Sequence, residues 1–154
     1  MSDSESVAQR FYSAFQRHDG KSMGDLYADS STFSDPVFPL LRAREVRAMW
    51  AMLTERAKDL SLTFSIEEES STEARTTWHA NYTFSKTGRK VENHITATME
   101  TENGLIVRHV DDFSFWRWSS QALGVPGLLL GWTPLLRAKI RTGAQESLRS
   151  YMEQ

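Results

Sequence analysis

The sequence Arg75-Thr-Thr-Trp-His-Ala-Asn-Tyr-Thr-Phe-Ser85 decides the fold class of this chain. Its apolar side chains alternate with polar ones, which is the period of a β-strand with one apolar and one polar face. Val91–Thr101 and Leu105–Trp116 continue the alternation after turns at Lys86–Arg89 and Glu102–Gly104. We therefore predict three consecutive antiparallel strands in this part of the chain.

The turn at Glu102–Gly104 determines which residues the third strand presents to the apolar face. If the turn has three residues, Thr101 pairs with Leu105, and His109 and Asp111 lie on the apolar face. If it has two residues, the register shifts by one and both side chains lie on the polar face. We expect the three-residue turn, with Val107 opposite Met99, His109 opposite Ala97 and Asp111 opposite Ile95.

The residues before these strands follow helical spacing. Ser2 and Glu5 form a predicted capping box for the first helix, and Asp19-Gly20 ends it. Helices that precede a run of strands predict an α+β fold, with the helices covering one face of an antiparallel sheet. The predicted elements are helices up to about Arg17, at Ser22–Tyr27 and at about Arg44–Asp59, and strands at Thr32–Ser34 and Leu60–Ile66.

The last part of the chain, residues 119–154, changes character. Val125–Trp132 predicts an apolar loop punctuated by glycines, and Thr133 with Pro134 predicts the start of a last helix. An apolar stretch of this kind has to cover another surface or be covered, so it either closes a pocket or contacts a second subunit. We interpret residues 1–154 as one domain, of which residues 119–154 are a C-terminal extension.

The composition excludes several classes of protein. The chain has 154 residues, 40% of them hydrophobic, and a net charge of −2, which gives no basic surface for nucleic acid. Without cysteine there is no disulfide or thiolate chemistry, and the longest apolar stretch is shorter than the about 20 residues that span a bilayer. The acidic N-terminus does not resemble a signal sequence. We expect a cytoplasmic protein with no nucleic-acid or membrane partner.

The four histidines lack the spacing of a metal site. We expect His79 and His94 near one another, about two rungs apart, as a solvated pair on the polar face of the hairpin. No metal and no cofactor are predicted.

The segment Tyr27–Pro36 closely resembles the same segment of ketosteroid isomerases, and Gln9–Phe11 and Thr87–Lys90 resemble that family at nearly the same spacing. With the order of elements over Val7–Trp116, the chain resembles the nuclear transport factor 2-like superfamily. This resemblance implies a cone in which a curved sheet wraps around helices and encloses a pocket. In the isomerases the aspartate before the proline is the general base, and Asp35 has that position.

Two positions depart from the isomerases. Where that family forms its oxyanion hole from a tyrosine and a protonated aspartate, this chain has Phe11 and Ala97, and neither side chain can donate a hydrogen bond. Loss of one such donor costs about 10²–10³ in rate, so steroid isomerisation is not expected. Tyr12 lies about 100° around the helix and is a weak substitute.

The resemblance also places His109, Asp111 and Phe113 on pocket-lining positions. A histidine with an aspartate in such a cone resembles the polyketide-cyclase branch, called SnoaL-like. The segments Phe113–Trp118 and Gln121–Gly124 resemble uncharacterised bacterial members of the superfamily.

Asp35, His109 and Asp111 are therefore the predicted catalytic residues. Burial of a carboxyl in an apolar pocket raises its pKa and prepares it to take a proton near neutral pH, where a histidine also titrates. A structural interpretation stays open, in which Asp35 caps the turn at Pro36 and the other two form a buried pair.

The predicted ligand-binding residues are mostly apolar, and core packing also explains most of them. Asn93 differs because a buried amide needs a partner, and we expect Tyr82 as its cross-strand neighbour. The set is Tyr12, Phe15, Phe33, Phe38, Trp50, Leu53, Trp78, Tyr82, Asn93, Met99 and Phe113.

Two hypotheses of function follow. In the first, a homodimer performs acid–base chemistry on a small hydrophobic molecule, such as isomerisation, cyclisation or dehydration, with Asp35 as the base and His109 and Asp111 as acid and orienting partner. In the second, the chain is a non-catalytic binding or assembly module in which these residues are structural.

Overall fold

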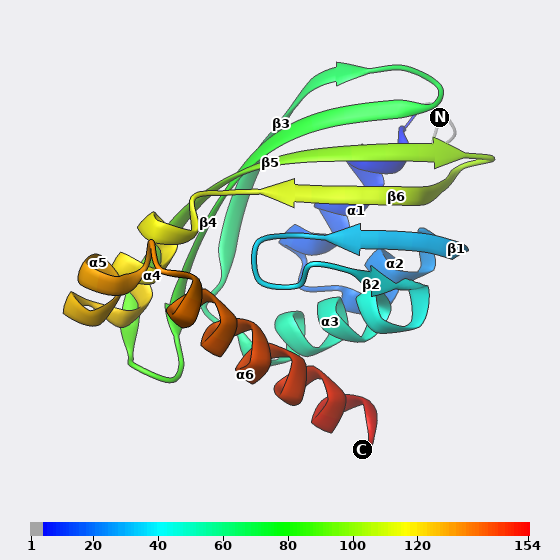
Figure 1. Cartoon of the computed structure of the whole chain (residues 1–154). Helices are drawn as coiled ribbons and strands as arrows, with labels where there is room; N and C mark the ends of the chain where they lie inside the picture. Colours follow the sequence, from blue (N-terminus) through cyan, green and yellow to red (C-terminus); the bar gives the residue numbers. More distant parts are fainter. Residues whose placement is uncertain (1–4) are drawn as a thin grey trace.

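The computed structural model describes residues 5–154 and has the predicted α+β architecture (Figure 1). A curved sheet of six strands is covered on one face by the N-terminal helices, and a long C-terminal helix runs beside them. No helix in this part of the chain is long and apolar enough to cross a membrane.

The N-terminal helices are α1 (Val7–Gln16), α2 (Gly20–Asp25) and α3 (Ala43–Arg56). The hydroxyl of Ser6 caps α1 by accepting a hydrogen bond from the Gln9 amide, whereas the predicted cap Ser2 lies outside the described residues. The carboxylate of Asp19 caps α2, so the second helix begins and ends earlier than predicted.

The sheet has the strand order β2-β1-β6-β5-β4-β3, in which β1 and β6 are parallel and all other neighbours are antiparallel. On β5 every second side chain from Val91 to Met99 is buried against the helices, as the alternation predicts. The strands are β1 (Tyr27–Ser34), β2 (Leu41–Arg42), β3 (Ser61–Glu69), β4 (Glu73–Phe84), β5 (Arg89–Glu102) and β6 (Leu105–Asp112).

The predicted three-residue turn between β5 and β6 is wrong. Glu102 pairs with Leu105 across a two-residue turn in which Asn103 and Gly104 both have positive φ, 53° and 78°. Such a turn matches the right-handed twist of the flanking strands.

A bulge in β6 nevertheless returns the following side chains to the apolar face. Thr101 pairs with Ile106, but the next residue, Glu100, pairs with Arg108, so Val107 is an extra residue. As a result His109 lies opposite Met99 and Asp111 opposite Ala97, and both are buried. The predicted partners were therefore wrong, and the predicted face is confirmed.

The C-terminal part contains more helix than predicted. Phe115–Leu123 forms α4 rather than the end of a strand, because the hydroxyl of Ser114 accepts a hydrogen bond from the Arg117 amide and caps a helix there. Val125–Leu130 forms the short helix α5 rather than a loop. The predicted start of the last helix is confirmed, since Thr133 caps α6 (Pro134–Met152).

Candidate functional site

A chain of hydrogen bonds crosses the interior between α3, β1 and β6. The Trp50 indole Nε1 donates to the Tyr27 hydroxyl at 2.8 Å, and that hydroxyl lies 2.7 Å from His109 Nδ1. The other ring nitrogen, Nε2, lies 2.9 Å from Oδ1 of Asp111. Apart from Asp111, at 4%, these side chains are at most 3% exposed, so the chain is shielded from water.

One arrangement of protons uses the hydrogen-bonding capacity of every group in this chain. Because the Trp50 N–H can only donate, the Tyr27 oxygen accepts from it and is free to donate its own proton to His109 Nδ1. His109 then carries its proton on Nε2 and donates it to the Asp111 carboxylate. This tautomer of His109 gives every member of the chain a hydrogen-bond partner.

Pairing in the sheet brings these residues together. The parallel ladder places Phe33 of β1 beside His109 of β6, and the bulge at Val107 turns the imidazole inward. Aromatic rings surround the imidazole, with Phe11 and Phe33 edge-on at centroid distances of 5.5 and 5.0 Å. The surroundings of the His109–Asp111 pair are consequently apolar.

Asp35 follows β1 at the turn before β2. Its Oδ1 accepts hydrogen bonds from the amides of Val37 and Phe38 at 2.7 and 2.6 Å, and its own amide donates to the Phe38 carbonyl. The predicted turn-capping role is thus confirmed. Burial and the negative charge of Asp111 raise the pKa of the Asp35 carboxyl to about 7, against the opposing effect of the amide hydrogen bonds and of His109.

Two buried donors near this site make no hydrogen bond within residues 5–154, the Tyr12 hydroxyl and the Trp78 indole N–H. The centroids of their rings are 6.1 Å apart. Burial, and secondarily the charge of Asp111, raises the pKa of Tyr12 well above its usual value, so its proton is available for donation. A buried donor without a partner costs about 1–3 kcal/mol, and a ligand oxygen would remove this cost.

The predicted ligand-binding residues lie mostly in the packed interior. Leu53, Tyr82 and Phe113 are partly buried, and the others are buried. Asn93 lies opposite Ala80 rather than Tyr82, so that predicted pair is wrong. Tyr82 instead lies opposite Val91, and its hydroxyl accepts a hydrogen bond from Trp118 Nε1 at 2.8 Å.

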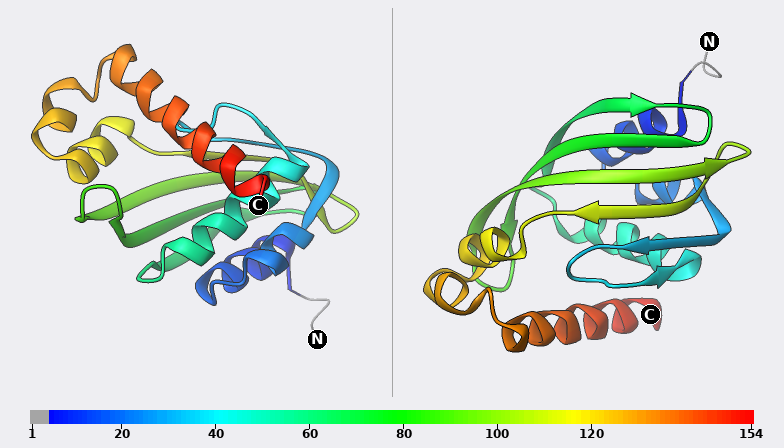
Figure 2. Two further views of the ribbon diagram at one scale, coloured as in Figure 1. Left: turned by 90° about the horizontal axis from the view of Figure 1, so that it is seen from below. Right: turned by 45° about the horizontal axis from the view of Figure 1, so that its top comes forward.

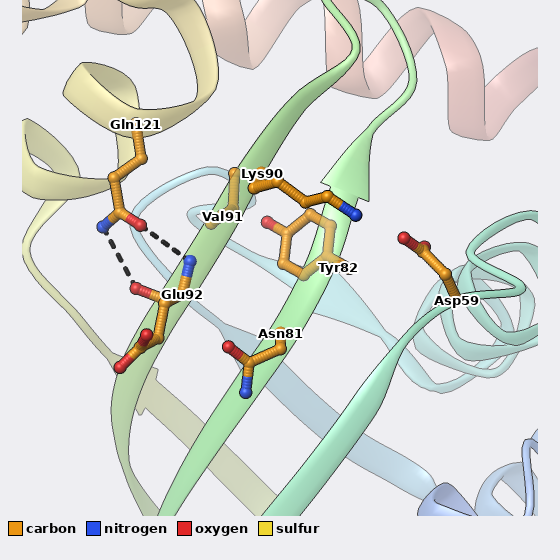
Figure 3. Close-up of a pocket in the computed structure, with 7 residues that line it drawn as sticks. All are labelled: Asp59, Asn81, Tyr82, Lys90, Val91, Glu92 and Gln121. Atoms are coloured by element: carbon orange, nitrogen blue, oxygen red, sulfur yellow. Dashed lines mark hydrogen bonds between the residues drawn. The ribbon is translucent and has the colours of Figure 1, made fainter.

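Tyr82 also lines an open pocket of about 320 Å³ at the end of the β4–β5 hairpin (Figure 3). Figure 3 shows the amide of Gln121, from α4, bridging the backbone N–H and C=O of Glu92, where β5 continues beyond the end of β6. Burial, and to a smaller extent the charge of Asp35, raises the pKa of Tyr82 against the opposing effect of its hydrogen bond with Trp118. The full lining is Asp59, Asn81, Tyr82, Lys90, Val91, Glu92 and Gln121.

His79 and His94 pair directly across β4 and β5, with ring centroids 4.1 Å apart, and not two rungs apart as predicted. Both side chains are exposed. Across residues 5–154, no group of three or more histidine or acidic side chains is arranged to hold a metal ion.

Comparison with known protein families identifies the chain. Residues 8–109, about two thirds of its length, match the SnoaL-like domain. This protein belongs to the SnoaL-like family. A comparison with functionally curated proteins gave no match.

Several solved structures have the same fold as this SnoaL-like protein. A hypothetical protein of ketosteroid isomerase-like fold from Catenulispora acidiphila, solved with trimethylamine, is 14% identical over 83% of this chain and 97% of its own, with a TM-score of 0.67. IdmH from Streptomyces antibioticus, a candidate polyketide cyclase, is 20% identical over 80% and 98%, with a TM-score of 0.63. An LEH-like epoxide hydrolase from M. tuberculosis is 16% identical over 80% and 92%, with a TM-score of 0.61. These likenesses confirm the nuclear transport factor 2-like cone.

Sequence reasoning did not place two residues in the hydrogen-bonded chain of His109. Tyr27 was assigned to the end of a helix and Trp50 only to the pocket wall, although together they orient His109. Ser31 and Phe33 are buried in alternation, but the exposed Asp29 interrupts that phase, so no alternation indicates that the strand begins at Tyr27.

Proposed function

We propose that this SnoaL-like protein performs acid–base chemistry on a small hydrophobic molecule that contains a carbonyl group. Asp35 is the base. The observation that carries the proposal is the arrangement of the Asp35 carboxyl, in which backbone amides hold Oδ1 while Oδ2 makes no hydrogen bond within residues 5–154. Burial and the charge of Asp111 raise the pKa of this carboxyl to about 7. A base of this pKa takes up and returns a proton efficiently near neutral pH.

The reaction begins when Oδ2 of Asp35, which makes no hydrogen bond within the described chain, takes a proton from the carbon next to the carbonyl. The electron pair of the C–H bond moves onto the carbonyl oxygen. Return of the proton from Asp35 to another carbon completes an isomerisation. In a cyclisation the carbanion attacks a second carbonyl carbon, and the oxygen of that carbonyl takes the proton from Asp35. In a dehydration the C–O bond of a hydroxyl group breaks, and that group takes the proton from Asp35 and leaves as water.

Other side chains stabilise the developing charge. The unpartnered Tyr12 hydroxyl and Trp78 N–H are donors for the substrate oxygen. His109 has partners on both ring nitrogens, so it fits the orienting role, while Asp111 keeps Asp35 protonated after the transfer. This division differs from the expected one, in which His109 was the acid and Asp111 its orienting partner. The donors are now Tyr12 and Trp78, and His109 has the orienting role.

Deuterium exchange tests this proposal without knowledge of the natural substrate. A series of small hydrophobic ketones is incubated with the protein in D₂O, and exchange at the carbon beside the carbonyl is followed by NMR. We expect a rate that rises with pH through about 7 and falls about 10²-fold or more in Asp35→Asn.

Asp112→Asn is the matched control, because Asp112 is the exposed neighbour of Asp111 on the opposite face of β6. It should exchange like the wild type. Equal rates in the wild type and Asp35→Asn would eliminate Asp35 as the base.

The packed interior favours a second function, a non-catalytic ligand-binding module. Phe11, Phe15 and Trp50 lie with ring centroids 5.1–6.4 Å apart, so aromatic side chains occupy much of the cone. Native mass spectrometry of protein purified from cells tests this alternative, which requires a co-purifying ligand and no exchange activity.

We also propose that the protein acts as a cytoplasmic homodimer. The broad outer face of the sheet supports the dimer, because no helix of residues 5–154 covers it (Figure 2).

A further inference from the structure

Helices α4 and α5 and the start of α6 meet at one end of the molecule (Figure 2). Large apolar side chains of these segments are exposed to solvent. We call this surface the apolar tip. The exposed fraction of the side chain reaches 73% for Trp132 and 82% for Leu135. In soluble domains, exposed apolar side chains are usually scattered singly over the surface rather than gathered in one patch. The tip consists of Trp116, Val125, Leu128, Leu129, Leu130, Trp132 and Leu135.

Close packing of α5 on α4 forces these side chains outward. A Cβ at Gly127 would lie 1.9 Å from the Ser119 carbonyl oxygen, and a Cβ at Gly131 would lie 2.2 Å from the Ser119 hydroxyl. The glycine face of α5 is therefore the face against α4, and its leucines point to solvent. The indole of Trp116 also donates to the Leu128 carbonyl at 3.0 Å, so the exposed surface is fixed in shape.

The segment that carries the apolar tip is basic in sequence. Residues 113–145 contain four basic residues and no acidic ones, although the whole chain carries −2. The basic hairpin turn Lys86–Lys90 packs against the same end, since Arg89 Nε donates to the Gln121 carbonyl and the Thr87 hydroxyl bonds the Ala122 carbonyl. The four basic residues are Arg117, Arg137, Lys139 and Arg141.

We propose that the apolar tip binds the surface of a membrane that contains anionic lipid. Exposed leucines and a tryptophan enter the boundary between headgroups and acyl chains, and the lysines and arginines of the same segment contact the anionic headgroups. The sequence led us to expect no membrane partner because no segment can span a bilayer, but binding at its surface needs no spanning segment.

Charge argues against a second copy as the occupant. Two tips facing each other would bring the same cations into opposition, and like charges opposed across an interface disfavour association. An anionic bilayer offers both the apolar layer and the opposite charge.

Vesicle co-sedimentation of the full chain tests the proposal. The probes are vesicles of phosphatidylcholine alone and vesicles with about one third phosphatidylserine, at 0.1 M and 0.5 M salt. We expect sedimentation with the anionic vesicles only, weakened at least fivefold at high salt. The double variant Leu129→Ser/Trp132→Ser should lower binding at least tenfold, as should Arg117→Glu/Lys139→Glu.

Each variant has a control on a distant element. Leu105→Ser removes an exposed leucine at the opposite end of the sheet, and Arg10→Glu reverses an exposed charge on α1. Both should bind like the wild type. Equal binding to neutral and anionic vesicles would overturn the proposal, and so would the absence of binding to either. If no vesicle binding is found and the protein instead forms a complex with an acidic protein, which the tip variants abolish, the proposal is also overturned. None of these results bears on the chemistry of Asp35.

Discussion

The two oxygens of the Asp35 carboxyl have different environments. Oδ1 is held by two backbone amides, while Oδ2 has no hydrogen bond within residues 5–154 and is available to a substrate. Protonation of this group is coupled to folding, because burial and Asp111 raise its pKa from 3.8 to about 7.

Asp35→Asn should therefore change how stability depends on pH. A raised pKa in the folded state means that the wild type loses stability as pH rises from about 4 through 7, whereas an asparagine stays neutral and still accepts from the same amides. We expect the variant to be more stable than the wild type by about 1–3 kcal/mol at pH 8 and similar at pH 4. Urea unfolding at both pH values measures this, and Asp112→Asn should show no such difference.

Tyr27→Phe tests the hydrogen-bond chain. The substitution leaves the Trp50 N–H and His109 Nδ1 without partners in a buried site, which should lower the free energy of unfolding by about 1–3 kcal/mol. Imidazole ¹⁵N NMR should show the Nε2-protonated tautomer of His109 in the wild type and loss of that single form in the variant. Tyr151→Phe, which removes an exposed hydroxyl bonded to Glu55, should change stability by less than about 0.5 kcal/mol.

At the scale of single residues, the sequence predicts what depends on local pattern. The inward faces of His109 and Asp111 follow from alternation, and Asp35 follows from its place before a proline. The contact of Tyr27 with His109 joins residues 82 apart in sequence, and its existence depends on a parallel pairing that no local pattern specifies.

At the scale of elements, β6 shows how two irregularities can cancel. The two-residue turn at Asn103-Gly104 moves every later side chain to the wrong face, and the extra residue Val107 moves them back. From the sequence, the correct face was expected on the basis of a three-residue turn, so the face is right although the turn from which it was inferred is wrong. The sequence could not predict the pairs, because neither the turn nor the bulge changes the alternation after residue 109.

The contact between α4 and α5 gives the element-scale prediction. Gly127→Ala places a methyl group where the Ser119 backbone lies, so α5 must move away, which should cost about 1–3 kcal/mol. Faster proteolysis between residues 124 and 133 should accompany the loss of stability. Gly143→Ala is the control, because in α6 the added Cβ meets only the Lys86 ammonium at 3.7 Å, and it should stabilise the protein by about 0.5–1 kcal/mol.

At the scale of the whole molecule, α6 ties the C-terminal extension to the SnoaL-like cone. Leu148 of α6 is 3% exposed within the main core, and Arg141 Nε donates to the carbonyl of Pro36, next to Asp35. If residues 119–154 belong to the same domain, Leu148→Ala should cost about 2–4 kcal/mol. Unfolding followed by circular dichroism and by tryptophan fluorescence should give one coincident transition, and two transitions would separate the extension from the cone.

The predicted homodimer and the apolar tip can be separated by one measurement. Each chain has a mass of 17.6 kDa, so light scattering at micromolar concentration should give about twice this value if the outer sheet face pairs two copies. Because the segment of the tip carries like charges, Leu129→Ser/Trp132→Ser should leave that mass unchanged. A monomeric wild type would contradict the dimer and leave the lipid proposal intact. A dimer that these substitutions dissociate would instead assign the tip to a second copy and remove the reason to expect lipid there.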